Sequence, residues 1–192
     1  MIRSAIHSIK PVFHQHRKIS TNSVPQYVKD INEKDIAEAN ARGRGNWALT
    51  DTPNKGWGIY AQRDFEPNTK IFEGRGLIRS QDRNTHSVQI DWDAHVLMDL
   101  PAVYINHSCD ANAGIKDNKL GAFDFFAVKP IKKGDEITWD YGASEFDSIS
   151  FSDCLCGNPK CRKGKIGFRF AQSDIKSLYG DYIAGYLKSY KP

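Results

Sequence analysis

Short strand-like runs separated by turn signals make up most of the chain after Trp47, and this alternation limits the possible folds more than any other feature. The runs are rich in β-branched and aromatic residues, and the segments between them carry Asp, Asn, Pro and Gly. They cover residues 47–50, 58–62, 69–74, 87–92, 94–100, 121–128 and 136–141. We therefore expect a mostly β fold of short sheets. Because long alternating helices are absent, a doubly wound α/β fold with a dinucleotide site is disfavoured.

Two segments outside these runs have a helical pattern. Residues 31–42 predict a short helix that ends at the glycines of the sequence RGRG. Apolar residues after position 168 recur at helical spacing, which predicts a C-terminal helix with its N-cap at Ser173. The chain thus divides into a basic leader at 1–30, a domain of strands at 45–150, a cysteine-containing segment at 151–168 and a helical tail at 169–192.

The positive charge of the chain is confined to its N-terminal part. The formal net charge is +4, and residues 1–29 contain five basic residues and no acidic residue. Of the 27 basic residues, 22 therefore remain in the rest of the chain, against 23 acidic ones, which leaves a net charge of −1 there. Proteins that bind nucleic acids usually present a basic surface. We accordingly expect no direct nucleic-acid binding.

The basic leader has the pattern of an amphipathic helix. Isoleucines recur at helical spacing, Arg3 and Lys10 lie off that face, and serines are frequent. Such an acid-free segment is typical of a mitochondrial transit peptide, and the alternative is a disordered basic tail. No run approaches 18 apolar residues, so we expect no membrane span. The expected location is intracellular: mitochondrial if the leader is a transit segment, otherwise cytosolic or nuclear.

The cysteines form a cluster that predicts a metal site. Cys154, Cys156 and Cys161 have the spacing C-x-C-x4-C, and Cys109 lies 45 residues upstream of the first. A bridge between Cys154 and Cys156 would close a small strained ring, which disfavours a disulfide framework. Structural zinc has four tetrahedral ligands, so the cluster needs one more. The fourth is Cys109 or a histidine. The candidate histidines are His86, His95 and His107.

Three other motifs carry groups suited to ligand binding. In GWG at 56–58, glycine allows the backbone to approach a ligand closely, although a tight hairpin also explains it. Asn106 and His107 can hydrogen-bond a polar ligand, and the alternative is a polar loop anchored by the metal. Tyr141 ends the last strand-like run, where its hydroxyl can orient a substrate or transfer a proton. Core packing is the alternative for this tyrosine.

Together these motifs resemble those of SET-domain protein lysine methyltransferases, in the same order and with similar spacing. The matching segments are KGWGIYA at 55–61, YINHSCDAN at 104–112, DEITWDYG at 135–142 and CLCGNPKCRKG at 154–164. The resemblance covers about residues 45–168, and the tail resembles that of short stand-alone SET proteins. It implies a SET domain at 45–150 with a pseudo-knot, in which 104–109 passes through a loop next to 136–141. A post-SET zinc cluster at 151–168 and a C-terminal helix would come after it.

The resemblance implies methyl transfer from S-adenosylmethionine to the side-chain amine of a protein lysine. Tyr141 would be the catalytic residue. The cofactor-binding residues would be Lys55, Gly56, Trp57, Tyr104, Asn106, His107 and Leu155. One structural zinc would be bound by Cys109, Cys154, Cys156 and Cys161. The partner would be a histone or non-histone protein that presents a lysine, and the sequence does not indicate the oligomeric state.

Two positions depart from the pattern of the family. Gly74 stands where many members have a tyrosine that lines the lysine channel. Trp139 stands where they have Phe or Tyr, a position that influences how many methyl groups are added. We assign both residues to the substrate channel and hypothesise that the Trp139 indole fills the volume that Gly74 leaves empty.

These departures keep a second class of function open. In that alternative the chain is a catalytically inactive SET-like binding module that zinc stabilises. A third class, a zinc-ribbon nucleic-acid binder, is disfavoured by the net charge of −1 over residues 30–192 and by the lack of a second cysteine pair.

Overall fold

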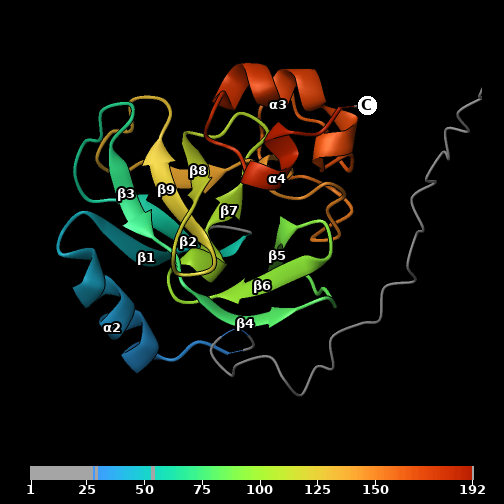
Figure 1. Ribbon diagram of the computed structural model, residues 1–192. Helices are drawn as coiled ribbons and strands as arrows, with labels where there is room; N and C mark the ends of the chain where they lie inside the picture. Colours follow the sequence, from blue (N-terminus) through green and yellow to red (C-terminus); the bar gives the residue numbers. More distant parts are fainter. Residues whose placement is uncertain (1–27, 29, 53–54, 192) are drawn as a thin grey trace, which may run out of the picture.

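The computed structural model describes residues 28, 30–52 and 55–191 (Figure 1). Its strands are Trp47–Thr52 (β1), Gly56–Ala61 (β2), Lys70–Glu73 (β3), Gly76–Ser80 (β4), Ser87–Asp91 (β5), Ala94–Met98 (β6), Asn106–His107 (β7), Ala113–Asp117 (β8), Phe123–Ala127 (β9) and Glu136–Trp139 (β10). The larger sheet has the order β1-β2-β10-β8-β9-β3, and β7 also pairs with β10; the smaller sheet has the order β4-β6-β5. The prediction of a mostly β fold of short sheets is confirmed.

Three strands lie where we expected loops, and each has a weak local pattern. β4 alternates poorly because its central residues are exposed, and β7 has only two residues. β8, with the sequence AGIKD, contains a glycine and two charged residues. Its register is set instead by five paired positions along β9 and one along β10. Pairing with distant strands therefore overrides the local signal.

The predicted N-terminal helix is confirmed as α2, Glu33–Gly43. Asn32 caps it by accepting a hydrogen bond of 3.0 Å from the backbone N–H of Asp35, and the Asp35 side chain bonds back to the Asn32 N–H. The helix ends at Gly43, within RGRG as predicted, and its C-cap is Arg44, which has a positive φ of 48°. The side chain of Asn40 accepts a 2.7 Å bond from the backbone N–H of Leu49, which fastens the helix to β1.

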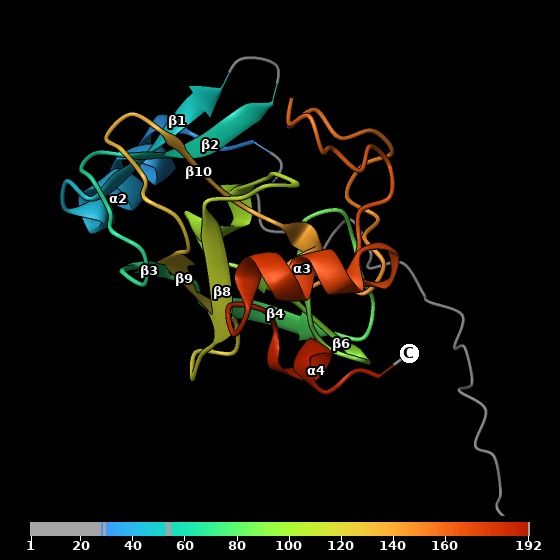
Figure 2. The ribbon, with the colours of Figure 1, turned by 90° about the horizontal axis from the view of Figure 1, so that it is seen from above.

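The C-terminal tail forms two helices rather than the single one predicted. α3 spans Gln172–Tyr179 and α4 spans Gly185–Lys188. The prediction of an N-cap at Ser173 is wrong, because α3 continues directly from the 3-10 turn Phe168–Phe170 and its N-cap residue makes no side-chain cap. Gly180, with a φ of +53°, ends α3 and turns the chain towards α4. In Figure 1 both helices lie at the upper right and α2 lies at the lower left, and Figure 2 also shows them apart from α2.

The strands β7 and β10, which are 29 residues apart in sequence, run parallel and side by side. Asn106 pairs with Thr138 and His107 pairs with Trp139, and the Ser108 N–H donates a 3.1 Å bond to the Trp139 carbonyl. The juxtaposition of 104–109 with 136–141, which the family resemblance implies, is therefore present. It places Asn106 and His107 next to Tyr141.

The basic leader at 1–30 lies outside the described residues, apart from Val28 and Asp30, so its predicted helical pattern stays a prediction. Within the described part of the chain, no helix has the length and apolar character needed to cross a membrane.

Candidate active site

Two cavities share part of their walls at the end of β10. The larger has a volume of about 560 Å³ and the smaller about 200 Å³, and both are lined by Lys55, Asn106 and Tyr141. The larger also contains Gly56, Trp57 and Tyr104 in its wall, and the smaller contains His107 and Leu155. The structure thus brings together all seven residues predicted to bind a cofactor, and places Tyr141 among them.

Asn106 connects the floor of the site to β2. Its side-chain amide donates to the Trp57 carbonyl at 3.1 Å and to Glu136 Oε1 at 2.8 Å, while Glu136 also forms an ion pair with Lys55. A Cβ on Gly58 would lie 2.9 Å from Asn106 Nδ2 and 2.7 Å from Thr52 Cγ2. Glycine is therefore required at position 58 for Asn106 to approach the strand.

We expect Asn106→Ala to weaken S-adenosylmethionine binding by at least about tenfold, because two hydrogen bonds that shape the wall of the larger cavity are lost. Isothermal titration calorimetry measures the affinity. Gln62→Ala, at an exposed position of the adjoining turn, is the control and should bind like the wild type. Equal affinities for Asn106→Ala and the wild type would contradict the assignment of Asn106 to a cofactor site.

Tyr141 is held by two hydrogen bonds at the junction of the two cavities. Its backbone N–H donates to His107 Nδ1 at 3.1 Å, and its hydroxyl donates to the Ile105 carbonyl at 3.1 Å. Burial, with a smaller contribution from Glu145, raises the pKa of Tyr141 well above its usual value of 10.0. The phenol therefore stays protonated at neutral pH, so it can orient a ligand but cannot remove a proton from one.

His107 supports this arrangement as a neutral ring. Burial lowers its pKa to about 4. Because Nδ1 accepts the hydrogen bond from the Tyr141 N–H, the ring hydrogen lies on Nε2, which is 3.2 Å from Cys109 Sγ. His107 therefore links the backbone at Tyr141 to the cysteine cluster.

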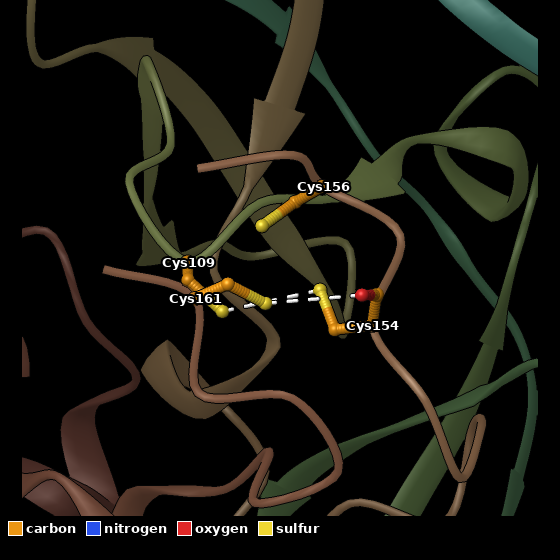
Figure 3. A group of neighbouring side chains, drawn as sticks. All are labelled: Cys109, Cys154, Cys156 and Cys161. Carbon is orange, nitrogen blue, oxygen red and sulfur yellow. Dashed lines mark hydrogen bonds between the residues drawn. The ribbon is translucent and has the colours of Figure 1, made fainter. Parts of the chain in front are cut away.

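The four cysteine side chains converge next to the smaller cavity (Figure 3). Their sulfur atoms all lie within 4.8 Å of one another, and no described histidine belongs to the group. Cys109 comes from the loop after β7, and the other three come from residues 154–161. A set of four thiolates at this separation fits the tetrahedral coordination of structural zinc. The alternatives in which His86, His95 or His107 completes the set are wrong for this arrangement.

An ion pair fastens the cysteine segment to the residue that comes directly after β10. Arg162 Nη2 lies 2.5 Å from Asp140 Oδ1, and Asp140 is fully buried. The Arg162 backbone N–H also points at Cys109 Sγ, 3.4 Å away. Asp140 immediately precedes Tyr141, so the position of the cysteine segment and that of the tyrosine are coupled through one buried contact.

The two predicted channel residues lie in different surroundings. Trp139 lines the larger cavity, with its ring centroid 5.3 Å from that of Tyr141. Gly74 does not line it: a Cβ there would lie 3.0 Å from Ala102 Cβ and 3.3 Å from Met98 Sδ. Met98 and Ala102 themselves line the cavity, so they occupy the volume beside Gly74.

Sequence reasoning missed many of the residues that line the larger cavity. They come from β5 and its preceding turn, from the end of β6, from the segment after Tyr141, and from residues upstream of α2. The missed residues include Val28, Ile31, Thr85, Ser87, Val88, Met98, Glu145, Ser150 and Phe151. No motif marks them. The only available signal was an acidic residue, Glu145, four positions after the predicted catalytic tyrosine.

The parallel contact of β7 with β10, the tyrosine that comes after it and the adjacent cysteine quartet define a SET-type site. Comparison with known proteins agrees: the SET domain model matches residues 56–142. Residues 56–142 therefore form a SET domain, the domain of the family that the motifs resemble.

Individual relatives are similar over most of the chain. Histone-lysine N-methyltransferase ash1 of Drosophila melanogaster is 27% identical over 79% of this chain, and the H3 lysine-36 specific enzyme of Saccharomyces cerevisiae is 31% identical over 73%. The chain spans only 8% and 21% of these two relatives, respectively. Among solved structures, KRYPTONITE in complex with mCHG DNA and SAH has a TM-score of 0.52 and 26% identity, over 62% of this chain and 29% of that one.

Proposed function

We propose that the chain transfers a methyl group from S-adenosylmethionine to the side-chain amine of a protein lysine. The observation that carries this proposal is the convergence of Tyr141 and the seven predicted cofactor residues on two adjoining cavities. The relatives named as histone-lysine N-methyltransferases support it, as does the presence of SAH in the KRYPTONITE structure.

The cavity walls fit the proposed cofactor. Lys55, Gly56 and Trp57 would contact its methionine part, and Asn106 and His107 would hold it from the side of β7. Leu155, which is 69% exposed, lines the smaller cavity and would cover the adenine. When bound, S-adenosylmethionine would supply an electrophilic methyl group on a positively charged sulfur.

The wall residues would prepare the lysine for transfer. A lysine amine has a pKa near 10.4 in water, and only its neutral form is a nucleophile. Burial between Trp139, Met98 and Val88 disfavours the charged form and aligns the nitrogen, which lowers the entropic part of the barrier. The Tyr141 hydroxyl donates its hydrogen to Ile105, so the oxygen keeps lone pairs that can orient a methyl group by C–H···O contacts.

The four cysteines would bind one structural zinc ion. Phe151, Asp153 and Leu155 lie on the cysteine segment or just before it, and all three line the smaller cavity. Zinc would thus hold this segment as a cover over the cofactor and the channel. The proposed domain boundaries are a SET domain at 45–150, a post-SET cluster at 151–168 and a helical tail at 169–192.

Two measurements test the proposed function. Calorimetry with S-adenosylmethionine should show binding, and labelled methyl transfer to a whole-proteome extract, followed by mass spectrometry, should show methylated lysines. Tight cofactor binding without transfer to any extract would favour the alternative of an inactive, zinc-stabilised binding module. Absence of S-adenosylmethionine binding by the zinc-loaded protein would contradict both the methyltransferase and the inactive binding module.

The partner of the site would be a protein that presents a lysine, histone or non-histone. We propose no direct nucleic-acid binding, because residues 30–192 have a net charge of −1. The KRYPTONITE structure includes DNA, so a gel-shift assay with duplex DNA is the test, and a shift at physiological salt would overturn this point.

The proposed location depends on the leader. If residues 1–29 form a transit segment, a fluorescent reporter fused to them should enter mitochondria in eukaryotic cells. A version with Arg3 and Lys10 changed to Glu should stay outside. If the reporter with the native leader remains cytosolic, the mitochondrial location is excluded and the protein is cytosolic or nuclear. The histone-lysine methyltransferase relatives favour a nuclear location.

A further inference from the structure

Glu145 is a buried carboxylate in the wall of the larger cavity. It is 5% exposed, and its Oε1 accepts a 2.6 Å hydrogen bond from the backbone N–H of Gln89 in β5. The Gln89 side chain in turn accepts a 3.0 Å bond from the Phe146 N–H. The carboxylate is therefore held between β5 and the segment after Tyr141, and it cannot turn freely towards bulk water.

This carboxylate forms no ion pair with any described residue, since no lysine, arginine or histidine nitrogen of the described ranges lies within 4.0 Å of it. Arg83 favours its ionised form from a distance but donates to the Asp147 carbonyl at 2.7 Å. Asp147, Tyr141 and Tyr186 also interact with it electrostatically, and none of them is a cation. His86 lines the same cavity, and burial lowers its pKa, which favours the neutral ring. A buried carboxylate with one N–H donor is costly unless a cation joins it.

The position of Glu145 indicates which cation would join it. Its anchor, Gln89, belongs to the smaller sheet, together with the cavity residues Ser87 and Val88. The predicted cofactor residues belong mainly to β2 and β7 of the larger sheet. Lys55, on that side, is already paired with Glu136. The unpaired carboxylate is therefore anchored to the cavity residues of the smaller sheet, which the proposed function does not assign to the cofactor.

We propose that Glu145 receives the ammonium group of the substrate lysine inside the larger cavity and accepts the proton that this group loses before methylation. The inference rests on the proposed function and adds a proton acceptor to it. Tyr141 does not fill this role, because its hydroxyl already donates to the Ile105 carbonyl and stays protonated.

The proton transfer is balanced. One N–H bond of the ammonium breaks and one O–H bond forms on the carboxylate, which converts an ion pair into an amine and a carboxylic acid. The amine nitrogen then forms its bond to the methyl carbon as the carbon–sulfur bond breaks, with the electron pair going to sulfur. Glu145 afterwards releases its proton to water at the cavity mouth. Burial raises the pKa of Glu145 to about 7 and lowers that of a bound lysine, so the two groups approach each other in proton affinity.

The test uses Glu145→Gln, which keeps the acceptor for the Gln89 N–H but removes the charge. Glu66→Gln, at an exposed turn, is the matched control. The first probe is n-butylammonium chloride, the lysine side chain without its backbone, compared with 1-butanol, which has the same number of heavy atoms. Both are titrated by NMR into zinc-loaded full-length protein saturated with S-adenosylhomocysteine, at pH 8.

We expect the wild type and Glu66→Gln to bind butylammonium at least about tenfold more tightly than butanol, and Glu145→Gln to lose this preference while binding S-adenosylhomocysteine normally. On the peptide identified by labelled transfer, kcat/KM of the wild type should rise as the pH passes through about 7, because Glu145 becomes ionised. Glu145→Gln should lack this rise and fall about a hundredfold in kcat/KM.

Several results would overturn the inference: a butylammonium preference that survives in Glu145→Gln, a wild type without any preference, or an unchanged pH profile in the variant. If the variant does not fold, ¹³C-labelled wild type replaces it. Butylammonium should then change the NMR chemical shift of the Glu145 carboxyl carbon, and butanol should not. If the cation preference depends on Glu145 but no extract is methylated, the proposed function fails while the cation site stands.

Discussion

Tyr141→Phe is expected to reduce methyl transfer at least about a hundredfold while leaving S-adenosylmethionine affinity within about twofold of the wild type. The hydroxyl is fixed by its 3.1 Å bond to the Ile105 carbonyl, and the ring by the bond between its backbone N–H and His107. The variant keeps the ring and the cavity shape but removes the oxygen that orients the reacting groups. Labelled transfer and calorimetry on the same preparations separate the two effects.

The control for this variant is Tyr60→Phe on β2, which is not among the residues that line either cavity. It should retain wild-type transfer. A Tyr141→Phe protein with full activity would refute the assignment of Tyr141 as the catalytic residue. A parallel loss of cofactor affinity and transfer would instead place the hydroxyl in the cofactor site.

Cys154→Ser is expected to lower the zinc content from about one ion per chain to less than about a tenth of that value, because three thiolates bind zinc far more weakly than four. Methyl transfer should be lost with the metal. The cysteine segment carries Leu155 over the smaller cavity and Arg162 towards the buried Asp140, so its release opens the cofactor site and removes the partner of a buried charge. Atomic emission spectroscopy measures the loss of zinc, and labelled methyl transfer measures the loss of activity.

Ser152→Ala, at an exposed position of the same segment, is the control and should keep both metal and activity. Chelation of zinc from the wild type should reproduce the effect of Cys154→Ser, and zinc should reverse it. Full transfer by metal-free protein would show that the cluster is not needed to cover the site.

Local sequence patterns predicted those parts of the fold that depend on neighbours along the chain. The capping of α2 by Asn32 and the apolar content of β9 and β10 are of this kind. β7 was missed because it is defined by pairing with β10, 29 residues further on, and β8 because its register is set by pairing with β9 and β10 rather than by its own pattern. The N-cap at Ser173 was wrong because the preceding 3-10 turn starts the helical backbone earlier.

The candidate site likewise has features that the sequence predicted and features that depend on contacts between distant segments. Cysteine spacing alone indicated three metal ligands, and the family resemblance pointed to Asn106, His107 and Tyr141. Whether a fourth thiolate or a histidine completes the quartet depended on where the loop after β7 meets residues 154–161. That meeting is a contact between chain segments 45 residues apart, which no local pattern encodes.

The sequence by itself therefore determined the fold class, the family and the chemical groups available, because these depend on residue type and spacing. Tertiary structure decided which groups face one another. It placed Met98 rather than Trp139 against Gly74, and it enclosed Glu145 in the cavity wall without a cation partner among the described residues. The physical reason is that burial and pairing here involve residues far apart in the sequence. The parallel pairing of β7 with β10 and the packing of the smaller sheet bring these residues together.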